Sequence, residues 1–207
     1  MIHSKKYLLK IEFTSPILGS QPGKNTPASD YLRSKVARDR PELDIADETG
    51  TLPEELVKGT TMFHRDPAGK PAYLNYHVKG MLKNSGEVLN GLEGYKAMRS
   101  KIDNCVYVSP RVLPIDGVLS EAPLERPLRA MTAQGPRVSL ARSELIEAGA
   151  KIECIIECVQ TAKFTLTADL LRDLLDYGSK AGMGQWRNSG QYGQFSYILT
   201  ELVEEAK

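Results

Sequence analysis

The stretch AGMGQWRNSGQYGQFSYIL, from Ala181 to Leu199, joins a helical pattern to a strand pattern through a glycine-rich loop. Glycine permits positive φ and close approach to the main chain, so such a loop can present successive N–H groups to an anion. Arg187 can add a bidentate phosphate contact, and Trp186 offers a face for a base. The alternative is a mobile turn in which Trp186 covers the edge of the core and Arg187 pairs with a carboxylate. The glycines of this loop are Gly182, Gly184, Gly190 and Gly193.

The patterns on either side of the loop are clear. Residues 167–178 (TADLLRDLLDYG) place four leucines on one stripe and predict a helix that Thr167 caps and Gly178 terminates. Residues 194–203 (QFSYILTELV) predict the last strand.

Working outward, period-two alternation predicts a first strand over Tyr7–Phe13 and another within 145–160. Residues 76–92 predict a helix that Gly80 and Gly86 weaken, and Gly80 suggests close approach of a neighbouring backbone or a bound chain. The strong elements follow the order strand, helix, strand, strand, helix, strand. This order predicts an α+β fold, a ferredoxin-like split βαβ core similar to RNA-recognition domains, with insertions at about 19–75 and 114–150 in a single domain spanning 1–207.

Within these insertions, short helices are expected at YLRSKVARD and LPEELVKG, and a hairpin around the turn Pro67–Lys70. The proline-punctuated, arginine-rich residues 116–149 are expected to form a long loop.

Composition is that of a globular protein, with 41% apolar and 26% charged residues. No apolar run is long enough to cross a bilayer or to act as a signal peptide, so we expect a cytoplasmic protein without membrane contact. The odd number of cysteines, without metal-type spacing to the three histidines, argues against disulfides and zinc. Cys154 and Cys158 are expected in the core, and no cofactor or metal is expected.

Charge is unevenly distributed although the net charge is only +1. Residues 42–55 hold six acidic residues and no basic one, whereas residues 126–142 are rich in arginine. A dipolar surface for head-to-tail assembly is one interpretation, and two ordinary solvated faces are the other.

Three segments resemble the RAMP superfamily, the repeat-associated proteins of CRISPR systems. They are GMGQWRNSGQYGQF (182–195), which is similar to the glycine-rich loop of that superfamily, NYHVKGMLK (75–83), and TSPILGSQPG (14–23) at the end of the first strand. Together with TMFHRD and LERPLRAMTAQGPRVSLARSE, the chain most closely resembles an uncharacterised family of proteins carried by phages and prophages of Gram-positive bacteria.

The superfamily resemblance implies a backbone-type subunit that binds single-stranded RNA or DNA, as a homo-oligomer or in a CRISPR-like ribonucleoprotein. It implies that Lys79 and Gly80 lie along the path of the strand, and that Gly182, Gly184, Arg187, Gly190 and Gly193 shape an RNA-facing or sheet-packing loop. A single-strand site also needs a basic track and aromatic platforms, which Lys83, Trp186, Tyr192, Arg126, Arg129 and Arg137 can supply.

Two other functions stay open. A metal-independent endoribonuclease would need a histidine or tyrosine base and a lysine, and the histidine candidates are His77, beside Lys79, and His64. Neither stands in the early-helix position that such nucleases favour, so we expect a binding protein and not an enzyme. The third possibility is a phage protein that binds or replaces host CRISPR components.

Overall fold

The computed structural model describes residues 3–22, 60–92, 95–132, 135–161 and 164–202, and for residue 22 and residues 128–139 it describes the backbone alone. The chain divides into two compact units. Unit 1 comprises residues 1–17, 64–119 and 146–207, and unit 2 comprises residues 18–63 and 120–145. The predicted insertions, 19–75 and 114–150, contain most of unit 2. That the whole chain acts as a single domain stays a prediction.

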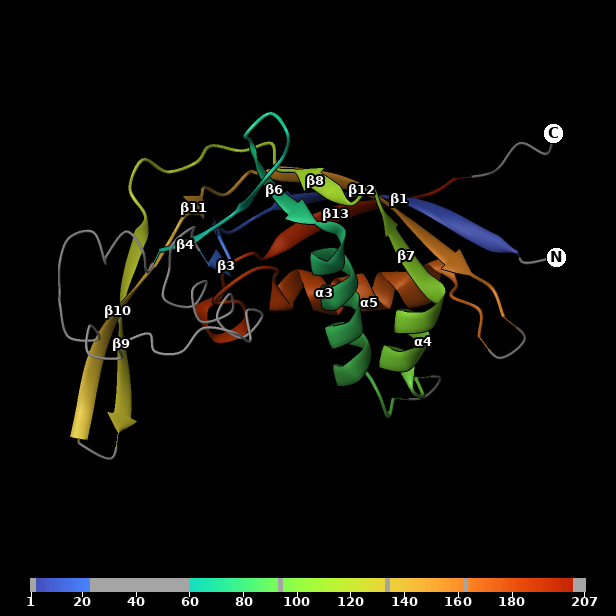
Figure 1. Cartoon of the computed structure of the whole chain (residues 1–207). Helices are drawn as coiled ribbons and strands as arrows, with labels where there is room; N and C mark the ends of the chain where they lie inside the picture. The colour runs from blue at the N-terminus through green and yellow to red at the C-terminus, as the bar shows by residue number, and fades with distance from the viewer. Residues whose placement is uncertain (1–2, 23–59, 93–94, 133–134, 162–163, 203–207) are drawn as a thin grey trace, which may run out of the picture. The chain divides into compact units, whose positions relative to one another are not determined.

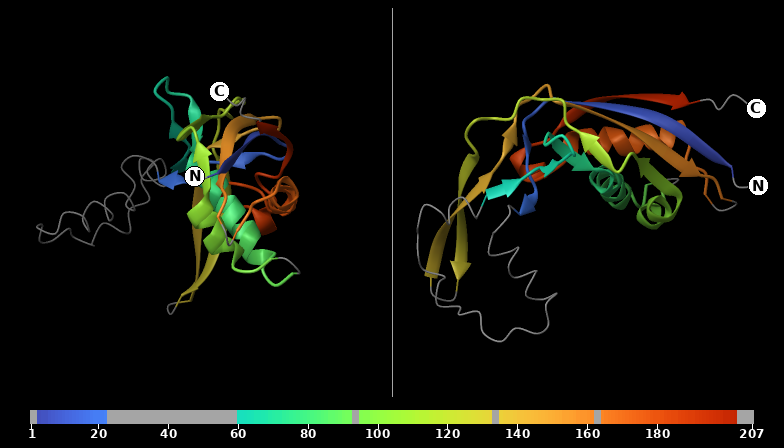
Figure 2. Two further views of the ribbon diagram at one scale, coloured as in Figure 1. Left: turned by 90° about the vertical axis from the view of Figure 1, so that its right-hand side faces the viewer. Right: turned by 45° about the horizontal axis from the view of Figure 1, so that its top comes forward.

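Unit 1 is built on a four-stranded antiparallel sheet with the strand order β13-β1-β12-β7. Helices α3, α4 and α5 lie on one face of this sheet, as Figure 1 and Figure 2 show. The α+β prediction is confirmed. The bounds are β1 (Ser4–Phe13), α3 (Asn75–Val88), α4 (Met98–Cys105), β7 (Val106–Ser109), β12 (Lys151–Val159), α5 (Ala168–Ala181) and β13 (Phe195–Leu202).

Alternation in β1 and β12 buries one side of each strand beneath the helices, as the sequence predicts. Cys154 and Cys158 lie in this core, and burial raises the pKa of each thiol to about 12. Thr167 caps α5, because its hydroxyl accepts a hydrogen bond from the Leu170 N–H at 3.2 Å.

The predicted end of α5 at Gly178 is wrong, since the helix continues to Ala181 and is capped by Gly182 at φ +82°. A Cβ at Gly178 would collide with the sulfur of Met81 and lie 3.3 Å from the Ser85 hydroxyl, both on α3. Gly178 therefore allows α5 to pack closely on α3, and sequence spacing could not reveal that contact.

A smaller sheet has the strand order β5-β6-β8. In the chain, β5 and β6 come before α3 and β8 comes after it. The turn predicted at Pro67–Lys70 connects β5 to β6, with Gly69 at φ +81°. The second strand of this hairpin ends at Leu74, and α3 begins at the next residue. The bounds are β5 (His64–Arg65), β6 (Pro71–Leu74) and β8 (Val112–Pro114); β2 (Ile17–Leu18) pairs with β11 (Leu145–Ile146).

Unit 2 contains a sheet with the order β3-β4-β10-β9. The prediction of a long loop is wrong, because β9 and β10, of nine residues each, form an antiparallel hairpin. Pro127 is tolerated since β9 is an edge strand, and Pro136 since β4 pairs with β10 only at Arg142 and Ser143. The bounds are β3 (Gln21–Pro22), β4 (Thr60–Met62), β9 (Leu124–Thr132) and β10 (Gly135–Ser143). The two predicted short helices and the acidic residues 42–55 lie outside the described residues.

Candidate nucleic-acid interface

The glycine-rich loop closes on its own backbone. The Met183 N–H donates to the Gly193 carbonyl at 2.9 Å, and the Gly193 N–H donates to the carbonyl of Pro16, just after β1, at 2.9 Å. A Cβ at Gly193 would strike the Met183 main chain, and one at Gly182 would strike the Tyr192 carbonyl. Both glycines also have positive φ, +72° and +82°. The first role of Gly182 and Gly193 is therefore structural.

The tip of the loop differs from its base. Trp186, Asn188 and Gln191 all have left-handed backbones, with φ between 57° and 60°, which side-chain-bearing residues adopt infrequently. Trp186 is half-buried, whereas Arg187 is exposed. Gly184 has φ +87°, and Gly190 ends the short 3₁₀ helix η2 (Asn188–Gly190). The tip thus presents Arg187 to solvent beside a half-buried indole.

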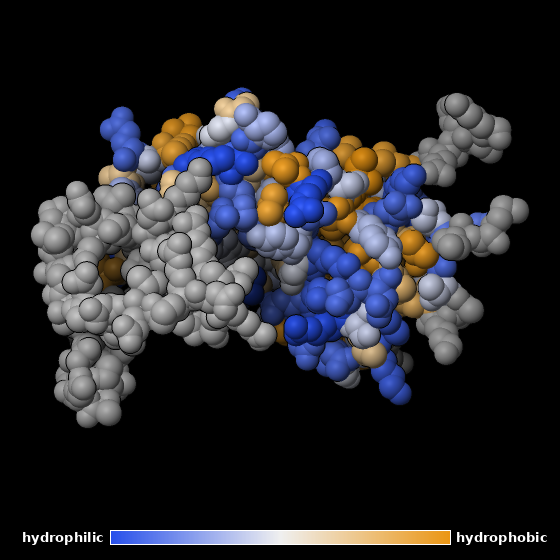
Figure 3. All heavy atoms as spheres, viewed as in Figure 1, coloured by the Kyte–Doolittle hydropathy of each residue, from blue (hydrophilic) through white to orange (hydrophobic). Residues whose placement is uncertain are grey.

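A second candidate surface lies on α3 and β7, and we call Tyr76, Lys79, Lys83 and Tyr107 the Tyr–Lys stripe. Residues three and four apart are neighbours on a helix, so Tyr76, Lys79 and Lys83 follow one side of α3. The Lys79 Nζ lies 5.5 Å from the centre of the Tyr107 ring. Tyr76 is 52% exposed and Tyr107 54% exposed. Figure 3 shows hydrophilic residues gathered over α3 and α4.

Gly80 lies between the two lysines of the stripe, and a Cβ there would meet nothing within 4 Å. Within the described residues, no neighbouring backbone explains this glycine, although close approach was one expected reason. The space over Gly80 is open to a ligand. Gly86 differs, because a Cβ there would lie 2.8 Å from the Cδ1 of Ile102 on α4.

Asp103 of α4 engages both lysines of the stripe. Its carboxylate lies 3.0 Å from the Lys83 Nζ and 3.6 Å from the Lys79 Nζ, and its backbone carbonyl accepts from Lys79 at 2.8 Å. The hydrogen bond from Lys83 holds the pKa of this carboxyl below its usual range. Two ammonium groups that share one exposed carboxylate form an anion site already occupied by the protein itself. A phosphate would have to displace Asp103.

The start of α3 brings together the two histidines named from the sequence. Their rings lie 5.8 Å apart, and the His64 Nε2 is 3.0 Å from the Tyr76 hydroxyl. The Tyr76 ring stacks on His77 with a centroid distance of 4.4 Å. The Nδ1 of His77 is 3.1 Å from the Leu74 N–H, so neutral His77 caps the helix. The expectation that neither histidine lies early in a helix is wrong for His77, which occupies the first turn of α3.

Both histidines have lowered pKa values. Burial lowers the pKa of His64, and burial, together with the nearby His64, lowers that of His77. A lowered pKa favours the neutral form of each ring. The Nδ1 of neutral His77 already accepts from the Leu74 N–H, so His64 is the ring with a basic nitrogen available as a proton acceptor. The spacing of the sequence could not show this pair, because β5 and α3 meet only in the folded chain.

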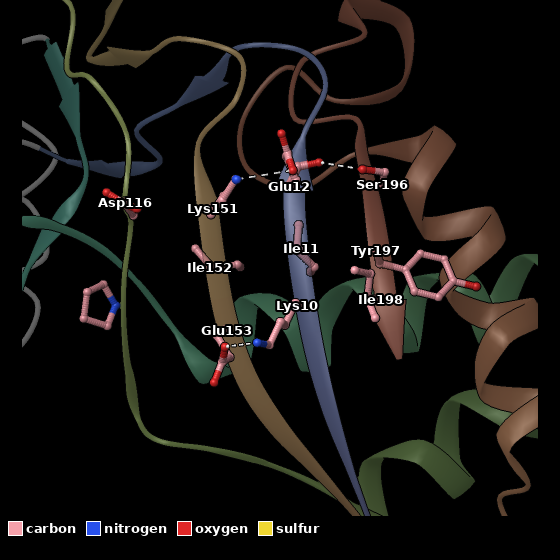
Figure 4. Close-up of a pocket in the computed structure, with 11 residues that line it drawn as sticks. Lys10, Ile11, Glu12, Asp116, Lys151, Ile152, Glu153, Ser196, Tyr197 and Ile198 are labelled. Carbon is pink, nitrogen blue, oxygen red and sulfur yellow. Dashed lines mark hydrogen bonds and ion pairs between the residues drawn. The ribbon is translucent and has the colours of Figure 1, made fainter. Parts of the chain in front are cut away.

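The open face of the sheet in unit 1 has a different character. Lys10 pairs with Glu153 at 3.3 Å, and Lys151 with Glu12 at 3.6 Å, around a cavity of about 470 Å³ (Figure 4). Among the described residues, Tyr197 is the one aromatic residue that lines this cavity, and its hydroxyl bonds to Asp176 on α5. Mutually paired charges without aromatic platforms do not suit a single nucleic-acid strand.

The arginines predicted to bind nucleic acid lie in unit 2. Arg126 and Arg129 belong to β9, and Arg137 belongs to β10. Arg142 of β10 forms an ion pair with Glu125. The predicted residues therefore lie in three segments of the fold: the α3 residues Lys79, Gly80 and Lys83, the loop after α5, and the strands of the β9–β10 hairpin.

Within the described residues, no group of three or more histidine, cysteine, aspartate or glutamate side chains could hold a metal ion. No described helix is both long and apolar enough to span a bilayer.

Of the comparisons with known proteins, the one with solved structures gives a match. No protein-family model and no curated protein matches the chain. Among solved structures, the chain is similar to part of the structure described as "Cryo-EM structure of the Type III-B Cmr-beta bound to cognate target RNA". The TM-score is 0.49 and the sequence identity is 12%. The match covers 96% of this chain and 61% of the other, so this chain spans less than two thirds of the length of that neighbour.

Proposed function

We propose that this protein binds single-stranded nucleic acid, RNA foremost, through the Tyr–Lys stripe. The observation that carries the proposal is the alignment of two half-exposed tyrosine rings with two lysines beside an unobstructed glycine. Single-strand binding sites combine aromatic faces on which bases stack with cations that follow the phosphates. Gly80 lets the strand pass close to the helix backbone.

The stripe is suited to reading backbone and base faces, not base sequence. Lysine is a point charge for a phosphate, and tyrosine stacks with any base. Base-edge readout would need converging amide or guanidinium groups, which the stripe lacks. We therefore expect binding with little sequence preference and strong salt dependence.

In this proposal Arg187, at the tip of the glycine-rich loop, adds a phosphate contact. The arginines of the β9–β10 hairpin are candidates for separate phosphate contacts in unit 2. The RAMP resemblance of the sequence favours a ribonucleoprotein subunit of the CRISPR backbone type that repeats along its RNA, and the resemblance to phage and prophage proteins favours a phage-borne one. The acidic residues 42–55 would then face the arginine-rich residues of the next copy. A role in binding or replacing host CRISPR components would use the same RNA surface.

The test is fluorescence anisotropy with labelled single strands of about 20–40 nucleotides, which cover several sites. Substituting Lys79→Ala together with Lys83→Ala should weaken binding and reduce the salt slope by about 0.7 for each lysine that contacts phosphate. Lys10→Ala, on the open sheet face, is the matched control and should leave the slope unchanged. Equal affinity of the wild type and the double variant would refute the stripe as the binding surface.

Arg187→Ala tests the loop separately. We expect weaker binding with unchanged thermal stability, because an exposed arginine that contacts phosphate contributes to the complex and not to the core. Parallel losses of stability and affinity would instead identify Arg187 as a structural residue.

A second candidate function is favoured by the histidine pair. His64 and His77 have lowered pKa values, lie 5.8 Å apart, and adjoin an exposed tyrosine in the first turn of α3. One neutral imidazole could remove the proton of a ribose 2′-hydroxyl, as a metal-independent endoribonuclease requires. The test is RNA cleavage in the presence of chelator: cleavage that both His64→Ala and His77→Ala abolish would support an enzyme. We expect no cleavage by the wild type and nearly intact affinity in both variants.

A further inference from the structure

The strand β13 has an open edge. It pairs with β1 along its whole length, from Phe195 opposite Phe13 to Leu202 opposite Lys6. On its other side, no strand of the described residues pairs with it, because β13 ends the sheet order. An edge strand of this length presents a row of backbone N–H and C=O groups to a further strand.

The usual devices that protect such an edge are absent from β13. Residues 195–200, FSYILT, contain no charge and no proline. The charge of Glu201 is balanced by Lys5 on β1, whose Nζ lies 3.0 Å from its carboxylate. The opposite edge strand, β7, has only four residues and follows α4 directly. The longer, neutral edge is therefore the one suited to pairing.

We propose that β13 pairs antiparallel with β13 of a second copy of this chain, forming a symmetric dimer centred on Ile198. In an antiparallel pair, opposing side chains point to the same face of the sheet, whereas successive side chains of one strand alternate between faces. A two-fold axis perpendicular to the sheet must therefore pass through a residue position and not between two residues. Centring on Ile198 places each Ile198 opposite its symmetry mate.

The choice of Ile198 as centre follows from exposure and charge. Within one chain, Ile198 lies opposite Lys10 of β1, on the open face of the sheet, and it is 66% exposed (Figure 4). Facing its own copy, it loses this apolar exposure. In the same register, Ser196 faces Thr200 and Tyr197 faces Leu199 of the second copy, so no like charges oppose each other. Centring on Glu201 would instead place two carboxylates together.

The partner is a second copy because the strand is complementary to itself. If a charged strand of another protein paired with β13 instead, its charges would lie opposite the uncharged side chains of residues 195–200. Joining two copies makes one eight-stranded sheet with all helices on the same face. The contact consists of two strands and a few side chains, so it belongs to the small, concentration-dependent class of interfaces.

The dimer would be separate from the Tyr–Lys stripe. The stripe includes Tyr107 of β7, at the opposite edge of the sheet from β13. Each dimer would carry two stripes, and one long strand that reached both would bind more tightly than a short one. Dimerisation itself does not depend on nucleic-acid binding, and its test uses protein alone.

Cysteine cross-linking tests the register. In a Cys105→Ser background, Ile198→Cys should form a disulfide-linked dimer on mild oxidation. Directly opposed residues of antiparallel strands have Cα atoms roughly 4.5–5.5 Å apart, within the range of disulfides. Thr200→Cys alone is the matched control and should not cross-link, whereas Ser196→Cys combined with Thr200→Cys should. Cross-linking of Thr200→Cys but not Ile198→Cys would overturn the proposed register.

Light scattering tests the dimer without cross-linking. The wild type should approach twice the chain mass of 22.9 kDa as concentration rises, and Ile198→Lys should remain at the mass of one chain. Because Ile198 is exposed, this variant should unfold at the same temperature as the wild type at concentrations where the wild type is monomeric, which separates loss of pairing from loss of folding. A wild type that stays monomeric at every concentration would overturn the proposal.

Discussion

Two regions of unit 1 contain conspicuous glycines, and they use them in opposite ways. In the loop after α5, Gly182 and Gly193 lie against main-chain atoms, and a methyl group at either would collide with backbone. On α3, Gly80 has nothing within 4 Å of the position of a Cβ. The loop glycines serve the fold of the free protein, whereas Gly80 weakens a helix without serving any described packing contact.

This difference teaches that glycine content by itself is a poor guide to a binding surface. The loop has more glycines, positive φ values and the only tryptophan, yet its base is held by hydrogen bonds to Met183 and Pro16. The Tyr–Lys stripe has two lysines and only one neighbouring helical glycine, Gly80, yet it combines open space with exposed tyrosine rings. The predictions below test this contrast, beginning with the largest expected effect.

Substituting Gly193→Ala should destabilise the protein by at least about 2 kcal/mol, because both positive φ and a backbone collision oppose the methyl group. Gly69→Ala is the control, since Gly69 has a similar φ of +81° but open space, and it should cost about 1 kcal/mol for the backbone conformation alone. Denaturant unfolding measures both. Equal losses would mean that the loop is not closed as described.

Substituting Asp103→Asn should raise the affinity for single-stranded RNA a few-fold, because the carboxylate competes with phosphate for Lys79 and Lys83. Glu87→Gln is the matched control. It also breaks an ion pair between α3 and α4, with Arg99 at 3.6 Å, but involves neither lysine of the stripe. Anisotropy titrations at fixed salt measure both. An unchanged or lower affinity for Asp103→Asn would argue that the lysines do not contact phosphate.

Acid should weaken the start of α3 more than the glycine-rich loop, which has no histidine. The pKa values of His64 and His77 are lowered in the folded state, so the unfolded chain binds protons first as pH falls. Stability is therefore fully present above the unfolded value of 6.5 and is lost as pH falls through the lower folded values. His77→Gln keeps a capping side chain without this titration and should lose less stability between pH 7.5 and 5.5. Identical losses would contradict the assignment.

Substituting Gly80→Ala should stabilise the free protein by roughly 0.5–1 kcal/mol, as in an exposed helix interior, while weakening RNA binding. Gly86→Ala provides the comparison, because the Ile102 side chain must shift to admit its methyl group and should cancel this gain. Unfolding and anisotropy measurements on the same samples separate the two effects. Unchanged RNA affinity in Gly80→Ala would show that the strand does not pass over this residue.

Local sequence patterns were sufficient for the elements whose burial is regular. Alternation in β1, β12 and β13 and the leucine stripe of α5 predicted these elements, because one buried face imposes a fixed period on the sequence. The buried cysteines and the Thr167 cap follow from the same local rules. The β9–β10 hairpin was missed, because edge position and limited pairing with β4 let prolines stand where the sequence suggested a loop.

What the sequence alone determined is the identity of the candidate residues and the α+β order of elements, because both depend on local composition and period. Only the tertiary structure decided what each candidate contacts. It placed Asp103 between Lys79 and Lys83, brought His64 beside His77, and set Gly178 against Met81 on another helix. These contacts join residues from different elements, and their geometry follows from how helices pack on the sheet and on each other, which no local spacing records.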